Sequence, residues 1–172
     1  MLGVALFHGF SKMLIALGLE PAEMDTTVVP TPTPSGTDVA AIEPDPRTAL
    51  LSNRPDLASR WGHMAATLVA VAPEHAGAVD AVRVRLAQLM GVTWATEPTV
   101  EPIPGAGTHE MATEIAELFA IDVRAITPEH RDAVARSQGE TGLIQLVMAL
   151  AVYDGIYRMA AAVPEGTLHE PC

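Results

Sequence analysis

Hydrophobic side chains recur every three or four residues from residue 48 onward, which is the period of an α-helix. The first of these runs has Pro55 in the position of a first helical turn, and Pro73 marks its end. The next run predicts a helix over 76–91, which Gly91 ends as a C-terminal glycine commonly does.

Three further helices are predicted in the second half of the chain. Thr108 is a suitable N-cap for a helix over 109–121. Residues 127–129, Thr-Pro-Glu, combine a cap, a proline and an acidic first turn for a helix over 128–137. The last helix, over 142–162, is apolar on nearly all sides, so we expect it at the centre. No segment of useful length has the period of a strand, and the sequence therefore predicts an all-α fold.

The helix over 76–91 carries an apolar set expected to face the core and a polar set expected elsewhere. The apolar set is Val79, Val82, Leu86, Leu89 and Met90, and the polar set is Asp80, Arg83, Arg85 and Gln88.

The first 19 residues, "MLGVALFHGFSKMLIALGL", are apolar enough to suggest a signal or membrane segment. However, His8, Ser11 and Lys12 interrupt the run, whereas a signal peptide carries its positive charge before the apolar stretch. On a helical projection these polar residues lie on a different face from Met13 and Leu17. We therefore expect an amphipathic helix that docks on its own domain or on a sister subunit, no membrane partner, and a cytoplasmic location.

Residues 21–47 contain six prolines and no sustained period, so neither a helix nor an inner strand fits them. This segment is either a flexible tether or an arm that straps across the body or a neighbour. The chain thus divides into an amphipathic helix over 1–20, a Pro-rich arm over 21–47, one all-α domain over 48–163 and a tail over 164–172.

Composition excludes several classes of function. The net charge of −11 repels phosphate backbones, so nucleic acid is not an expected partner. Cys172 is the single cysteine, which rules out an internal disulfide and a Cys-rich metal site. The sequence "HEMAT" over 109–113 has Thr113 where a zinc motif needs its second histidine. We expect neither a metal nor a cofactor.

Two charged arrangements could carry chemistry. Asp80 sits in an otherwise apolar part of its helix, where a carboxylate near a core could hold its proton more tightly. The alternative is a first-turn acid that the helix dipole favours. Asp154 and Arg158 are four residues apart beside Tyr153 and Tyr157, and form either a structural ion pair at an interface or the polar end of a pocket.

Three segments together resemble one superfamily. Residues 49–69 read "ALLSNRPDLASRWGHMAATLV", residues 79–92 read "VDAVRVRLAQLMGV", and residues 116–163 include "TGLIQLVMALAVY". Their order, which covers about residues 49–163, is similar to that of the carboxymuconolactone decarboxylase and alkylhydroperoxidase D superfamily. The resemblance implies an all-α subunit that assembles as a trimer, hexamer or dimer.

The resemblance also implies where a redox site would lie. Peroxidase members carry a CxxC pair at a helix start, with an upstream Glu and a downstream His that relay protons. In this chain the acid falls on Asp80, the two cysteines on Val92 and Ala95, and the histidine on Thr99. Valine and alanine have no thiol, so the peroxidase mechanism cannot operate within this chain.

One hypothesis for function is a cofactor-independent acid–base enzyme of the lyase, decarboxylase or isomerase type, acting on a small organic molecule. Asp80 would carry the proton and Trp94 would form an apolar wall. Polar contacts would come from His63, Tyr153 or Arg158, and Val92, Ala95 and Thr99 would also line the pocket.

The alternative hypothesis is a non-catalytic oligomeric binding or scaffold protein in which Val92, Trp94 and Ala95 fill the pocket. A peroxidase whose thiols come from Cys172 of another chain is a third, physically possible arrangement.

Overall fold

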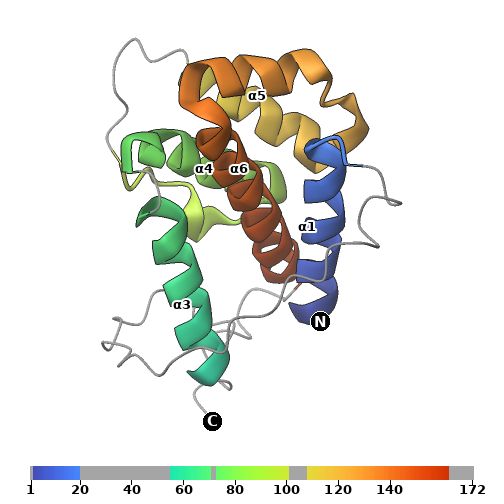
Figure 1. Cartoon of the computed structure of the whole chain (residues 1–172). Helices are drawn as coiled ribbons and strands as arrows, with labels where there is room; N and C mark the ends of the chain where they lie inside the picture. The colour runs from blue at the N-terminus through green and yellow to red at the C-terminus, as the bar shows by residue number, and fades with distance from the viewer. Residues whose placement is uncertain (1, 20–54, 71–72, 101–107, 163–172) are drawn as a thin grey trace, which may run out of the picture.

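The computed structural model describes residues 2–19, 55–70, 73–100 and 108–162, and within these ranges the elements are helices (Figure 1). The α-helices are α1 (Leu2–Ala16), α3 (Pro55–Ala70), α4 (Ala76–Met90), α5 (Thr108–Ile121) and α6 (Pro128–Ala161). The short 3₁₀ helices are η2 (Pro73–His75), η3 (Thr93–Ala95) and η4 (Val123–Ala125). The all-α prediction is confirmed for these residues, whereas the predicted arm over 21–47 and tail over 164–172 lie outside them.

Helix α6 is the central element, as its apolar composition predicts. Helices α1, α4 and α5 pack on it, and α4 and α5 also pack on each other. Leu150 and Ile156 of α6 have no exposed surface, and neither does Phe119 of α5. Helix α3 contacts α4, η2 and α6.

The helix ends lie close to where proline and glycine predict them. Helix α3 begins at Pro55, and Gly91 caps α4 with a left-handed φ of 70°. Thr127 is the N-cap of α6, and its backbone N–H donates to Nδ1 of His130 over 3.0 Å. The two helices predicted over 128–137 and 142–162 form one element, α6, interrupted at Gly139, where φ is 73° and ψ is 174°.

Helix α1 docks on α6 of its own chain. The two backbones approach closely at Gly9, where a Cβ atom would overlap the carbonyl oxygen of Ala151. His8 and Ser11 are exposed, as expected for the polar face. The placement of Lys12 on that exposed face was wrong, because Lys12 is only 9% exposed and its ammonium group meets a carboxylate of α6.

Two expectations for α4 were also wrong. Leu89, expected inward, is 38% exposed near the end of the helix. Asp80 and Arg83, expected away from the core, are 6% and 4% exposed. They can be buried because they form an ion pair with each other and hydrogen bonds to the chain that follows α4.

Helix α6 is long and apolar enough, by length and composition, to cross a bilayer. Within the structure, 72% of its most apolar stretch is buried inside the bundle. A helix buried by its own domain has its apolar surface already covered, which is compatible with a soluble protein.

Candidate functional site

The carboxylate of Asp80 accepts four hydrogen bonds. Its Oδ1 accepts from Nε of Arg83 over 2.8 Å and from Oγ1 of Thr99 over 2.6 Å. Its Oδ2 accepts from the backbone N–H groups of Thr99 and Val100 over 2.8 and 3.1 Å. Because a carboxylate offers about four acceptor positions, these donors occupy its capacity.

These hydrogen bonds decide the protonation of Asp80. Burial alone would raise its pKa, but the hydrogen bonds from Thr99, Arg83 and Val100 outweigh burial and hold the pKa below its usual value. The expectation that Asp80 binds its proton more tightly was therefore wrong. The first-turn interpretation was wrong as well, since the first turn of α4 contains no acidic residue.

Arg83 connects Asp80 to the chain beyond the helix. Its Nη1 donates to the carbonyl oxygen of Ala95 over 2.7 Å, and its Nη2 donates to the carbonyl oxygen of Glu97. Arg83 and Asp80 together hold the segment 95–100 against α4. The sequence signal for this role was the i, i+3 spacing of an acid and an arginine on one helix.

The bend after α4 is filled by packed side chains. Val92 and Ala95, the positions that the resemblance assigns to cysteines, are 4% and 3% exposed and belong to the hydrophobic core. Trp94 is partly buried and packs edge-on against Tyr157, with 5.9 Å between ring centroids. The helix therefore ends in a compact turn at this point.

An aromatic stack continues from Trp94 into the interior. Tyr157 stacks on Tyr153 with ring centroids 5.8 Å apart, and Tyr153 meets the edge of Trp61 at 6.5 Å. These four residues are both tryptophans and both tyrosines of the chain. Tyr153, a predicted pocket residue, is 3% exposed and lies in the middle of this stack.

Arg158 belongs to a second ionic cluster, which joins three helices. Asp154, with no exposed surface, accepts from Nε of Arg158 over 2.9 Å and from Nζ of Lys12 over 3.3 Å. Both cations also donate to the carbonyl oxygen of Ala120 at the end of α5. Burial lowers the pKa of Lys12 even though Asp154 opposes the shift. The expected ion pair between Asp154 and Arg158 is confirmed, and Lys12 of α1 is a second cation on the same carboxylate.

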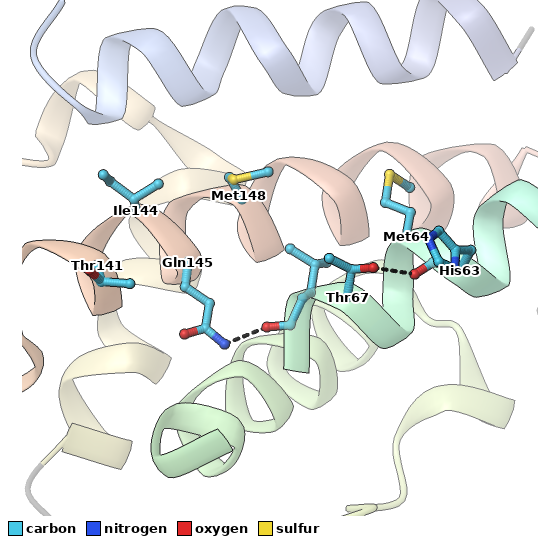
Figure 2. Close-up of a pocket in the computed structure, with 8 residues that line it drawn as sticks. His63, Met64, Thr67, Thr141, Ile144, Gln145 and Met148 are labelled. Carbon is cyan, nitrogen blue, oxygen red and sulfur yellow. Dashed lines mark hydrogen bonds between the residues drawn. The ribbon is translucent and has the colours of Figure 1, made fainter. Parts of the chain in front are cut away.

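His63 lines a separate feature, a groove between α3 and α6 (Figure 2). This α3–α6 groove has a volume of about 390 Å³. Nε2 of Gln145 donates to the carbonyl oxygen of Leu68 within it, which satisfies a carbonyl in the last turn of α3. The residues that line the groove are His63, Met64, Thr67, Leu68, Thr141, Ile144, Gln145 and Met148.

The structure thus distributes the predicted site residues over four places. Asp80, Thr99 and the carbonyl of Ala95 meet around Arg83, and Val92 is packed nearby in the core. Trp94 and Tyr153 belong to the aromatic stack. Arg158 joins the ionic cluster, and His63 lines the groove. Among the described residues, no group of three or more His, Cys, Asp or Glu side chains could hold a metal ion.

Sequence reasoning missed both the partner of Asp80 and the groove. Arg83 was expected away from the core, although its spacing to Asp80 allowed a pair. The groove has no local motif, because it forms only where α3 meets α6, two helices separated by more than fifty residues.

Comparison with known proteins found no matching family model, no matching curated protein and no matching solved structure. The superfamily resemblance therefore stays a prediction from the sequence, and the chemistry of the chain is argued from its own residues.

Proposed function

We propose that this protein is a non-catalytic binding protein whose ligand is a small, uncharged and mostly apolar molecule held in the α3–α6 groove. The observation that carries this proposal is the state of Asp80. An ionised acid that already accepts four hydrogen bonds is a poor proton carrier, since taking up a proton would sacrifice bonds from Arg83 and Thr99. This arrangement counts against the acid–base hypothesis, in which Asp80 carries the proton.

The size and lining of the groove support a ligand site. Its volume of about 390 Å³ falls in the range of roughly 300–1,000 Å³ that is typical of small-molecule pockets. Met64 and Met148 lie on opposite helices, and the flexible thioether side chain adapts to ligands of different shape.

The charge of the lining favours an uncharged ligand. Among the lining residues His63 is the one titratable group, and Lys, Arg, Asp and Glu do not contribute. A charged ligand would lose its hydration in the groove without gaining an ionic partner. Hydroxyl groups of Thr67 and Thr141 at the rim remain able to accept a hydrogen bond, although the Thr67 hydroxyl already donates to the His63 carbonyl.

Ligand titrations followed by fluorescence test this function. The neutral probe phenylnaphthylamine should bind saturably, and its anionic analogue anilinonaphthalene sulfonate should bind at least about tenfold more weakly. Thr141→Phe places a ring at the groove and should abolish binding of the neutral probe. Thr93→Phe is the matched control, because it adds the same ring at an exposed position of η3. A preference for the anionic probe, or equal binding by both variants, would contradict the proposal.

Location and assembly are further parts of the proposal. The net charge of −11 and the burial of α6 within the bundle support a soluble protein, and we propose the cytoplasm as its location. The resemblance implies a homo-oligomer, for which the exposed side chains of α6 suggest a surface.

A further inference from the structure

The second half of α1 docks through an unusual set of buried positions. For residues 8–9 and 11–16, the buried positions are Gly9, Lys12 and Ala16, which are a glycine, a cation and an alanine. The large side chain of Ile15 is 38% exposed, and that of Met13 is only partly buried. Because hydrophobic stabilisation grows with the apolar area removed from water, these residues contribute little of it to the docking of α1.

The ammonium group of Lys12 is poorly compensated where it lies. It has three donors, but its Nζ reaches a carboxylate oxygen of Asp154 at 3.3 Å and the carbonyl oxygen of Ala120 at 3.5 Å. Both distances are long for a charged donor, and the third neighbour is the ring of Phe119, with its centroid 4.8 Å away. The lowered pKa of Lys12 agrees, because burial disfavours its charged form more than Asp154 favours it. Burying this charge therefore opposes the docking of α1.

Arg158 duplicates both hydrogen bonds of Lys12 at shorter distances. Its Nε donates to Asp154 over 2.9 Å, and its Nη2 donates to the carbonyl oxygen of Ala120 over 3.0 Å. These bonds join α5 to α6 and do not involve α1. Removing one partner of a buried ion pair is costly when it leaves the other charge uncompensated. Departure of α1 leaves Asp154 and the Ala120 carbonyl with a donor each.

We propose that α1 is a releasable helix, which detaches from α5 and α6 as a unit while the other helices stay folded, and that Lys12 weakens its docking. In the released state the Lys12 ammonium group returns to water, and Asp154 keeps Arg158. Release also uncovers the strip of α6 at Ala151, against which Gly9 packs. Proteins open locally in such cooperative units below the free energy of global unfolding. The inference does not depend on a ligand in the α3–α6 groove.

Hydrogen exchange of the isotope-labelled wild-type chain, followed by NMR, tests the release. The amides of Lys12, Met13 and Ala16 should share one opening free energy, and should exchange at least about a hundredfold faster than those of Leu150 and Ile156 in α6. Equal protection of α1 and α6 would overturn the inference. A protection that rises steadily from the first residue of α1 to the last would show fraying, and would overturn it as well.

Lys12→Met tests the role of the lysine. Methionine keeps an unbranched side chain, and its sulfur can contact the ring of Phe119. Because the charge is removed while Arg158 still serves both acceptors, exchange of the α1 amides should slow by at least about fivefold. His8→Met is the matched control, since it introduces the same residue at an exposed position of α1, and should change exchange by less than about twofold. Unchanged or faster exchange in Lys12→Met would overturn the inference.

Arg158→Gln should reverse the sign of that effect. In this background Lys12 provides the ionic partner of Asp154, so Lys12→Met leaves the buried carboxylate without a cation and should speed exchange of the α1 amides by at least about tenfold. The Arg158 side chain is 41% exposed, so the fold should survive its replacement, which far-UV circular dichroism verifies. Slower exchange after Lys12→Met in both backgrounds would show that Arg158 does not replace Lys12 at Asp154, and would overturn the inference. The wild-type and Lys12→Met measurements stand independently of this variant.

Discussion

Asp80 and Asp154 show how single acidic residues are accommodated inside an aliphatic core. Each carboxylate is nearly or fully buried and has a hydrogen-bonded arginine on its own helix, Arg83 or Arg158. Burying an ion is unfavourable unless it is paired and hydrogen-bonded, and both acids meet that condition. In the structure, both acids hold chain segments together.

Replacing Asp80 should therefore destabilise the protein. Asp80→Asn removes the charge that faces Arg83 and replaces two acceptor positions by an amide donor group, so the free energy of unfolding should fall by about 3 kcal/mol. Urea unfolding followed by circular dichroism measures the change. Asp132→Asn, at an exposed position of α6, should change stability by less than about 0.5 kcal/mol. Equal effects of the two substitutions would contradict the assigned role.

The lowered pKa of Asp80 also predicts a pH dependence. In the unfolded chain the aspartate pKa is about 3.9, and in the folded protein it is lower. The stabilisation is therefore complete above about pH 5, where the carboxyl group is ionised in both states, and is lost as the pH falls through the unfolded and then the folded value. Unfolding measured over a series of acidic pH values should show a steeper loss of stability for the wild type than for Asp80→Asn. Parallel curves would refute the shift.

The sequence identifies Asp80 as unusual but does not identify its partners. Thr99 and Val100 follow a bend and lie about twenty positions along the chain, where helical periodicity has no predictive value. The desolvation of Asp80 suggested a raised pKa, and the hydrogen bonds from Thr99, Arg83 and Val100 reverse that sign. Local pattern can therefore indicate that a buried acid exists, while its protonation depends on contacts made by the folded loop.

At the scale of elements, most helix ends were predictable because proline and glycine act locally. Pro55, Gly91 and Thr127 mark boundaries that the structure confirms. The way in which α1 docks was less predictable. A lysine is expected at the surface unless a buried carboxylate on another helix pairs with it, and the sequence does not reveal that partner. Here the partner is Asp154 of α6, which lies 142 positions along the chain from Lys12.

The close approach of α1 and α6 makes Gly9 intolerant of a side chain. Gly9→Ala would force the two backbones apart or displace α1, and should lower the free energy of unfolding by about 1–3 kcal/mol. Gly77→Ala in α4 is the matched control, because its Cβ meets nothing within 4 Å. That change should raise stability by about 0.5 kcal/mol, because alanine favours a helix. Thermal and urea unfolding of both variants measures the contrast, and a stabilising Gly9→Ala would contradict the docking.

At the scale of the whole molecule, the net charge of −11 opposes compact folding, because like charges on the surface repel one another. Salt screens this repulsion over a Debye length of about 10 Å at 0.1 M. The free energy of unfolding should therefore rise between low and moderate sodium chloride. Urea unfolding at several salt concentrations measures the change. A fall in stability with salt would instead indicate that attractions between opposite charges dominate.

The overall class of the fold was predictable from sequence, whereas the groove was not. Helical period and a helix that is apolar on all sides suffice for an all-α bundle around α6. The groove depends on the angle at which α3 meets α6, and that angle has no signature in either helix alone. The aromatic stack is a similar case, since its members come from α3, η3 and α6.

That stack has a spectroscopic consequence. The stack contains all the tryptophans and tyrosines in the chain. Each ring contacts the next in the order Trp61, Tyr153, Tyr157 and Trp94. Intrinsic fluorescence and near-ultraviolet ellipticity therefore report on the region where α3, η3 and α6 meet. Detachment of α1 would leave these optical signals almost unchanged, and following it requires a dye or an isotope label placed on α1 itself.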